Sequence, residues 1–261
     1  MINEVKNKYS IPMLEKVMEL LEVLSKFQNG LTLQEIYSEL NYSKTSVFRI
    51  LATLLDLGYL GRNGDNNRYF ISRKLFNLGV AALGESNIVE RAIEPMTRLR
   101  DEVKESVMLG TLIGDKVILL EQVIGSHSFT FVLKSGSSIC VHASAPGKVL
   151  FSAQTDAHQK RLLSSMTFKS FNENTIITIE EFKAEIERTK QKGYGVDIEE
   201  EIEGVHCIGA PIYNQFGDAI ACVWIAAPKG RLPLDCFDDV GQRIKMCADN
   251  ISEKLGYKPS K

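Results

Sequence analysis

Two helix starts in quick succession constrain the fold of this chain more than any other feature. Thr32-Leu33-Gln34-Glu35 is a capping box, in which the Thr32 hydroxyl accepts a hydrogen bond from the Glu35 N–H and the Glu35 carboxylate reaches back. Ser43 offers a second N-cap directly after the break at Asn41-Tyr42. Two short helices joined by such a tight turn are typical of a helix-turn-helix unit.

Apolar residues at helical spacing support an arrangement of three helices. Pro12 can open the first helix, since the N–H that it lacks would be unpaired there, and Gly30 is expected to stop it. The apolar positions of this helix are Leu14, Val17, Met18, Leu21 and Leu24. Those of the next two helices are Leu33, Ile36, Tyr37 and Leu40, and then Val47, Ile50, Leu51 and Leu54. The third helix therefore has a polar and basic outer face.

A β-hairpin follows the third helix. The segment from Gly58 to Ile71 predicts a strand, an Asn63-Gly64 turn with polar neighbours and a second strand. Arg62 and Arg68 lie at the two shoulders of this hairpin, where wing arginines enter the minor groove or hold the DNA backbone. The order of helices and hairpin predicts a winged helix-turn-helix.

The outer face of the third helix predicts contact with double-stranded DNA. Such a helix fits the major groove, its N-terminus and first hydroxyls bind phosphates, and Arg49 is long enough to reach a guanine edge. Residues 41–75 carry 6 Lys+Arg against 2 Asp+Glu, although the net charge of −2 excludes a uniformly basic chain. The candidate DNA-contacting residues are Thr32, Ser43, Lys44, Thr45, Ser46, Phe48, Arg49, Thr53, Arg62 and Arg68.

The same residues also have plain structural explanations. Thr32 and Ser43 cap helices with or without DNA, and Lys44 and Arg49 suit a solvated surface. Winged helices also mediate contacts between proteins, so a winged-helix protein with a protein partner is one alternative. A small-molecule enzyme with an incidental helical N-terminus is another.

Residues 73–104 predict two helices in series. The apolar stripe of the first is Leu75, Leu78, Gly79, Ala82 and Leu83, and that of the second is Ile88, Ala92, Ile93, Met96, Leu99 and Val103. These stripes meet either a symmetry mate or the chain's own C-terminal domain. The expected domains are a winged helix-turn-helix at 1–72, a helical linker at 73–87 and an effector-binding domain at 88–261.

From about residue 105 the pattern changes to strands mixed with helices, which predicts an α+β sheet domain. Strands are expected at 106–113, 117–123, 129–133, 207–213 and 219–226, and helices at about 145–153, 156–166, 179–192 and 235–255. Tight turns at Ile113-Gly114-Asp115-Lys116 and Gln215-Phe216-Gly217-Asp218 join two of the strand pairs.

Several classes of protein are excluded by what the chain lacks. None of the 5 cysteines has CxxC spacing, so neither a disulfide framework nor a zinc ribbon is expected. No GxSxG, HExxH or GxGxxG motif points to catalysis, and no cofactor is expected. The N-terminus lacks the apolar core of a signal peptide, and no apolar run reaches the about 18–20 residues of a membrane span. We therefore expect a cytoplasmic protein that is not an enzyme.

Three sets of residues resemble the IclR-type bacterial transcriptional regulators. The first is Ser43 to Arg49 with Leu57-Gly58-Tyr59, and the second is His142 to Lys148. The third runs from Gly193 to Asp197, continues through Glu200-Glu201 and Gly204, and ends with Cys207 to Ile212. The resemblance covers roughly residues 12–257, with the motifs in the same order.

This resemblance implies a GAF/profilin-like α+β effector domain behind the winged helix. It also implies dimers through the DNA-binding half, often assembled into tetramers. Proteins of this family regulate genes for the catabolism of carbon sources or aromatic compounds, most often as repressors. Their effectors are small organic, sugar or aromatic acids.

The expected effector site combines residues matched to the family with neighbouring apolar residues. Ala145-Pro146-Gly147 resembles the ligand-contacting turn, although Pro146 has no N–H to offer an anion. Trp224 and Ala226 stand where many relatives carry Ser, which favours a smaller pocket or stacking against a ring. The candidate effector-binding residues are Leu109, Phe131, Ile139, His142, Ala145, Pro146, Gly147, Asp197, Cys207, Trp224 and Ala226.

Some of these residues, and some of their neighbours, also have purely structural explanations. His142 is more often a structural hydrogen-bonding residue than a ligand contact, and Glu199-Glu200-Glu201 is expected to be a solvated acidic turn. Cys140, His142, Cys207 and Cys222 would have to converge in space to hold a metal, and their spacing gives no support for it. No metal site is therefore expected.

Overall fold

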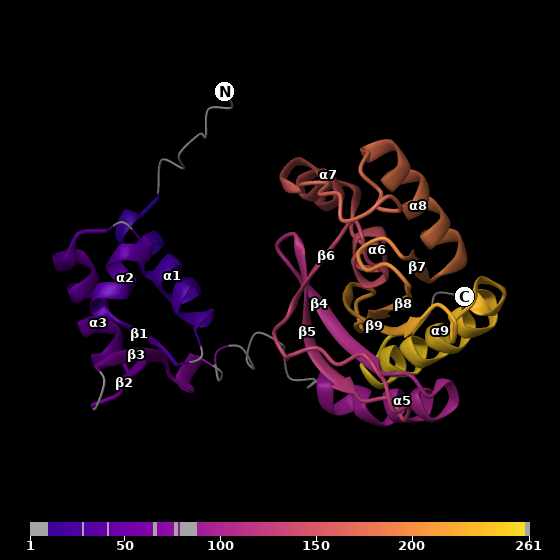
Figure 1. Ribbon diagram of the computed structural model, residues 1–261, viewed down its shortest axis with the longest axis horizontal. Coiled ribbons are helices and arrows are strands. Elements are labelled where there is room, and N and C mark those ends of the chain that lie inside the picture. The colour runs from indigo at the N-terminus through magenta and orange to yellow at the C-terminus, as the bar shows by residue number, and fades with distance from the viewer. Residues whose placement is uncertain are drawn as a thin grey trace. The chain divides into compact units, whose positions relative to one another are not determined.

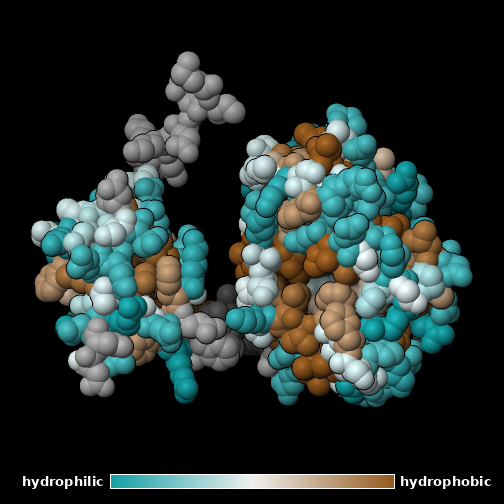
Figure 2. All heavy atoms as spheres, viewed as in Figure 1, coloured by the Kyte–Doolittle hydropathy of each residue, from teal (hydrophilic) through white to brown (hydrophobic). Residues whose placement is uncertain are grey.

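The computed structural model divides the chain into two compact units, Met1–Glu85 and Ser86–Lys261. It describes residues 10–27, 29–40, 42–64, 67–75, 78 and 88–258. Among these residues, no helix combines the length and the apolarity needed to cross a bilayer. Figure 2 shows brown apolar patches within the largely teal surface of the C-terminal unit, so its surface is not uniformly polar.

The described part of the N-terminal unit forms a winged helix-turn-helix (Figure 1). Its helices are α1 (Pro12–Ser25), α2 (Leu33–Leu40) and α3 (Lys44–Asp56), and its strands are β1 (Leu31–Thr32), β2 (Leu60–Arg62) and β3 (Arg68–Ile71). The strands form one antiparallel sheet in the order β1-β3-β2. The expected apolar faces of α2 and α3 supply much of its core, with Ile36 and Val47 fully buried. The expected face of α1 is wrong at Leu14 and Met18, which are 57% and 52% exposed, whereas Leu20, which was not expected there, is fully buried.

Both predicted helix caps of this unit are present. The Thr32 N–H donates to Glu35 Oε2 over 2.7 Å, and the Glu35 N–H donates to Thr32 Oγ1 over 3.3 Å. Ser43 Oγ accepts from the Ser46 N–H over 3.3 Å at the start of α3. The expected end of the first helix is wrong: α1 stops at Ser25, and Gly30 instead leads into β1 with a φ of 67°. A Cβ there would lie 2.3 Å from the Tyr69 carbonyl oxygen, so only glycine lets β1 pair with β3.

The C-terminal unit is built on a six-stranded antiparallel sheet in the order β6-β5-β4-β9-β8-β7. Its strands are β4 (Val107–Ile113), β5 (Lys116–Val123), β6 (Ser138–Cys140), β7 (Gly195–Ile198), β8 (Val205–Tyr213) and β9 (Ala219–Pro228). Its helices are α5 (Ile88–Val103), α6 (Ala145–Ser152), α7 (Asp156–Ser165), α8 (Ile179–Lys192) and α9 (Phe237–Lys254), with a short 3₁₀ turn, η1 (Leu234–Cys236), before α9.

Helices cover both faces of this sheet, α5 and α9 on one and α6, α7 and α8 on the other (Figure 1). Alternation along the strands assigns side chains to the two faces. On β9, Val223 and Ile225 join the α5–α9 core, whereas Cys222, Trp224 and Ala226 join the α6–α8 side. This split places the cavity described below on the α6 side.

The predicted strand at 129–133 is wrong. This stretch forms no strand, and β5 pairs instead with the unpredicted β6, for example Val117 with Ile139. The Leu133 N–H donates to Gln122 Oε1 over 3.1 Å, so a side chain satisfies the backbone in place of a neighbouring strand. β7, the opposite edge strand, was also not predicted from the sequence.

The second connector helix packs on its own domain. Ile88, Ala92, Met96 and Leu99 of α5 are buried in the core that α5 shares with α9 and the sheet, whereas Ile93 is 40% exposed. This resolves the choice left open for that stripe in favour of the chain's own effector domain. Most of the first stripe, including Gly79, Ala82 and Leu83, lies outside the described residues.

Candidate functional sites

The α3 helix presents a continuous outer face of candidate DNA-contacting residues. Lys44, Thr45, Phe48, Arg49 and Thr53 are exposed, while the intervening Val47, Ile50, Leu51 and Leu54 are buried. Phe48 is 58% exposed and adds an apolar ring to this otherwise polar face.

Arg49 is an exposed cation of this face. It makes no ion pair with any residue in the described ranges, whereas the Lys44 ammonium lies 5.1 Å from the centre of the Tyr37 ring. An unengaged guanidinium on an outward helix face is free to form a bidentate contact with a base edge.

The two wing arginines differ in how they are held. Arg62 is exposed, with its guanidinium 2.7 Å from Asn67 Oδ1 and 5.5 Å from the centre of the Tyr69 ring. Arg68 is partly buried and donates to the Gly30 carbonyl over 2.8 Å and to Glu35 over 3.0 Å. Since the same Glu35 carboxylate binds the Thr32 N–H, Thr32 and Arg68 join β1, α2 and β3 to one another.

The C-terminal unit contains a cavity of about 290 Å³ on the α6 side of its sheet. It is lined by seven of the residues expected there: Phe131, Ile139, Pro146, Asp197, Cys207, Trp224 and Ala226. The other lining residues, which sequence reasoning missed, are Met108, Leu133, Ser137, Ser138, Ser144, Glu201, Ile202 and Val205.

Four of the expected effector-binding residues lie outside this lining. Leu109 is wrong for a geometric reason: successive strand residues face opposite sides, so Met108 lines the cavity and Leu109 packs in the α5–α9 core. His142 is buried and bonded on both ring nitrogens, to Cys140 Sγ at 3.0 Å and the Lys169 carbonyl at 2.9 Å. Ala145 and Gly147 are buried within the first turn of α6.

Asp197 is the most perturbed acid of the cavity. It is 4% exposed on β7, and its Oδ1 accepts the Glu200 N–H over 2.8 Å. Burial, and next the charge of Glu200, raise the pKa of Asp197 to about 7. Cys207 faces it across the β7–β8 ladder, and burial raises the pKa of that thiol well above its usual value.

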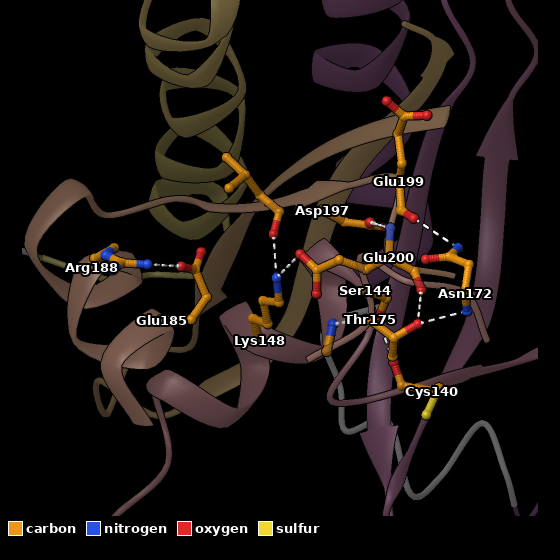
Figure 3. Close-up of polar contacts among 12 residues, drawn as sticks. Cys140, Ser144, Lys148, Asn172, Thr175, Glu185, Arg188, Asp197, Glu199 and Glu200 are labelled. Carbon is orange, nitrogen blue, oxygen red and sulfur yellow. Dashed lines mark hydrogen bonds and ion pairs between the residues drawn. The ribbon is translucent and has the colours of Figure 1, made fainter. Parts of the chain in front are cut away.

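The turn after Asp197 is built around a buried ion pair (Figure 3). Lys148 of α6 has no exposed side-chain surface; its ammonium binds a Glu200 carboxylate oxygen and donates to the Val196 carbonyl over 2.8 Å. Thr175 donates to the Glu200 carbonyl over 2.6 Å. The expected solvated acidic turn is therefore wrong for Glu200, which is 6% exposed, and for Glu201, which lines the cavity.

The missed lining residues share a cause. Ser137, Ser138, Glu201 and Ile202 lie in loops or beside a short edge strand, where no apolar periodicity marks an inward face. A usable signal was present only at Ser144, which caps α6 by accepting the Gly147 N–H over 3.2 Å. All five cysteines are free, and no group of three or more His, Cys, Asp or Glu within the described ranges is placed to hold a metal ion.

Comparison with protein families accounts for both units. Residues 13–64 match the IclR helix-turn-helix domain, and residues 80–253 match the C-terminal domain of the bacterial transcriptional regulator IclR. The second match alone spans more than half of the chain. The chain belongs to the IclR family of bacterial transcriptional regulators.

Individual relatives extend over nearly the whole of this IclR-family regulator. The HTH-type transcriptional regulator KdgR of Dickeya chrysanthemi is 30% identical over 248 residues, 95% of this chain and 81% of the relative. Among solved structures, the Thermotoga maritima IclR has a TM-score of 0.67 and 27% identity, covering 95% of this chain and 100% of that one. An IclR regulator from Alicyclobacillus acidocaldarius has a TM-score of 0.78 at 20% identity with the same coverage, which shows the shared fold.

The membership gives each unit its role. The N-terminal unit is the DNA-binding domain of an IclR-family transcriptional regulator, and the C-terminal unit is its small-molecule effector domain.

Proposed function

We propose that the chain is an effector-responsive repressor of genes for the use of a carbon source or small acid. In this proposal residues 1–72 bind operator DNA, 73–87 form the helical linker and 88–261 bind the effector. The observation that carries it is the cavity of about 290 Å³, with its buried carboxyl group Asp197, on a domain joined to a winged helix.

The proposed DNA contacts come from α3 and the wing. Arg49 and Phe48 approach base edges, Lys44, Thr45 and Ser46 hold phosphates near the helix start, and Arg62 reaches the backbone beside the groove. Their exposure supports this assignment. Thr32 and Arg68 support it indirectly, because their bonds to Glu35 fix the wing against α2.

The proposed mechanism is linkage between two sites on one chain. A homodimer through the DNA-binding half places two recognition helices in successive major grooves, about 34–36 Å apart. Effector in the cavity changes operator affinity by the coupling free energy, about 1–3 kcal/mol for such systems. The family resemblance favours dimers that pair into tetramers and effectors that are small acids.

We further propose that the chain catalyses no reaction and acts in the cytoplasm beside its operator. The only thiol that lines the cavity among the described residues is Cys207, and a pKa raised by burial keeps it protonated and a poor nucleophile.

Operator binding in the presence and absence of candidate effectors tests the proposal. Fragments of the protein's own upstream region are titrated with full-length protein, while small metabolites are screened by thermal shift. We expect specific binding that at least one stabilising metabolite changes by about 5–150-fold. Equal affinity for all duplexes, with every stabilising metabolite lacking effect, would contradict it.

A further inference from the structure

The charge of the cavity lining is opposite to what an acidic effector needs. Asp197 and Glu201 line the cavity, and none of the described lining residues is Lys, Arg or His. Lys148 is engaged by Glu200 and the Val196 carbonyl behind the wall. Lys116 and Lys169 act on Glu201 and Lys148 acts on Asp197, but all three lie outside the lining. A carboxylate entering here would therefore meet two carboxyl groups and no cation in direct contact.

The N-terminus of α6 does not replace the missing cation. Pro146 has no N–H, the Gly147 N–H donates to Ser144 Oγ, and the Lys148 N–H donates to the Ser144 carbonyl. The Ser144 hydroxyl in turn donates to the Cys140 carbonyl. In the first turn of α6, one N–H is therefore missing at Pro146, and those of Gly147 and Lys148 are already bonded to Ser144.

One wall of the cavity is a flat aromatic surface. Trp224 lies on β9, and its indole packs against the β4 backbone at Gly110, where a Cβ would come within 2.9 Å of the ring. On the other side, a Cβ at Gly209 of β8 would come within 3.0 Å of the Trp224 Cβ. Two glycines on the flanking strands thus make room for the indole, and Phe131 adds a second ring to the lining.

Hydrogen-bonding groups surround this aromatic wall. The Asp197 and Glu201 carboxyl groups accept from ligand hydroxyls, and Ser137 and Ser138 contribute hydroxyls of their own. The volume of about 290 Å³ lies at the lower end of the ~300–1,000 Å³ that is usual for ligand pockets. Several acceptors spread around a ring-sized space suit a ligand that carries several donors, rather than an amine with a single cationic group.

Building on the proposed function, we propose that this cavity selects an uncharged polyhydroxylated ring, the size of one sugar unit, over a carboxylic acid of the same shape. One apolar face of the ring stacks on Trp224, and its hydroxyls donate to Asp197 and Glu201. This effector class differs from the organic, sugar and aromatic acids that the family resemblance implies.

Matched pairs of probes test the selection directly. The full-length protein is titrated with D-glucose and D-glucuronate, and with D-galactose and D-galacturonate, and the fluorescence of Trp224, the only tryptophan, is recorded. We expect at least one sugar to bind about tenfold or more tightly than its acid. Tighter binding of an acid than of its matched sugar would overturn the inference, as would preference for D-glucosamine over D-glucose.

Variants locate the binding and separate the inference from the proposed function. Ala226→Phe fills the cavity and is expected to abolish binding, whereas Ala184→Phe on the exposed face of α8 leaves it unchanged. Glu201→Gln, at the partly exposed edge of the lining, is expected to raise the affinity for the acids about tenfold. Should Ala226→Phe fail to fold, the affinity of the Glu201→Gln variant for the acids tests the location of the site instead.

The outcomes have distinct meanings. Acid binding that Ala226→Phe abolishes overturns the sugar selection and leaves the cavity as the effector site. Binding that Ala226→Phe leaves intact, in a folded variant, removes the cavity from the proposed function. Absence of saturable binding by every probe overturns the sugar selection and leaves the proposed function to the operator titration with the screened metabolites.

Discussion

The recognition surface of α3 and the cavity of the C-terminal unit are built in opposite ways. The α3 surface comes from one helix of 13 residues, and its candidate contacts are exposed. The cavity draws on β4, β7, β8, β9, the start of α6 and the loop before β6, and its central acid, Asp197, is buried. The contacts of the first site all lie on one helix, whereas those of the second are brought together only when the whole sheet is folded.

Because of this difference, a substitution at the α3 surface reports mainly on binding, whereas one at the cavity reports on binding and stability together. A change on the exposed face of α3 alters binding with little effect on stability, because those side chains contact mainly solvent. A change beside the cavity also alters the free energy of unfolding, because the charged groups there are buried away from water and are stabilised by contacts with one another.

The largest expected effect is the loss of the buried cation behind the cavity. Lys148→Met leaves the Glu200 carboxylate buried without its ion pair, and we expect the free energy of unfolding of the C-terminal unit to fall by about 3–5 kcal/mol. Urea denaturation followed by Trp224 fluorescence reports on this unit, since the only tryptophan lies there.

Two controls show whether burial causes this loss. Lys190→Met removes an exposed ion pair with Glu187, whose two side chains are 38% and 62% exposed, and should cost less than about 1 kcal/mol. The double variant Lys148→Met/Glu200→Leu replaces the pair by apolar side chains and should recover much of the lost stability. Equal losses for Lys148→Met and Lys190→Met would show that the contrast between the two regions is wrong.

The next effect is a pH dependence that Asp197 gives to the C-terminal unit. Its pKa is raised to about 7 in the folded state by burial and by Glu200, so between pH 4 and 7 the folded state binds more protons than the unfolded one. The contribution of Asp197 to stability is therefore most favourable at low pH and is lost as the pH rises through 7. Lys148 and Cys207 also face this group, and both act to lower its pKa.

Asp197→Asn removes this titration and keeps an acceptor for the Glu200 N–H. From pH 5 to pH 8 the variant should gain about 2–3 kcal/mol of unfolding free energy relative to the unmodified chain, as follows from a pKa near 7. Urea denaturation at the two pH values measures it. A constant difference between the two proteins across this range would mean that Asp197 is ionised throughout.

The same contrast explains what the sequence predicts. The capping box at Thr32, the N-cap at Ser43 and the apolar stripe of α3 are local patterns, and all of them appear in the structure. The side of the sheet that each residue of β4 faces depends on register, which no local pattern determines. The sequence therefore predicts Leu109 in the cavity lining, whereas the structure places Met108 there. Burial of the Glu200 turn required Lys148, 52 residues earlier in the chain, which no local pattern connects to it.

For the DNA-binding unit, we expect the third effect on the affinity of Arg49 variants for operator DNA. Arg49→Ala should weaken specific operator binding by about 1–3 kcal/mol, roughly 5–150-fold, because a guanidinium that reads a base edge is lost. Its unfolding midpoint should stay unchanged, because Arg49 is exposed and forms no ion pair with a described residue. Lys26→Ala removes the same charge from the exposed end of α1 and should reduce only the salt-dependent, non-specific part of binding. Equal effects of the two variants on specific binding would remove Arg49 from base recognition.

The smallest effect compares one helix cap in each unit. Ser43 caps α3 by accepting the Ser46 N–H over 3.3 Å, and Thr155 caps α7 by accepting the His158 N–H over 3.4 Å. Replacing either by Ala should cost about 1 kcal/mol of stability in its own unit. Only Ser43→Ala should also weaken operator binding, because its hydroxyl and the start of α3 lie where a phosphate is expected to bind. Fluorescence anisotropy with a labelled operator measures both variants, and a comparable loss of affinity for Thr155→Ala would show that the cap at Ser43 acts on DNA only through stability.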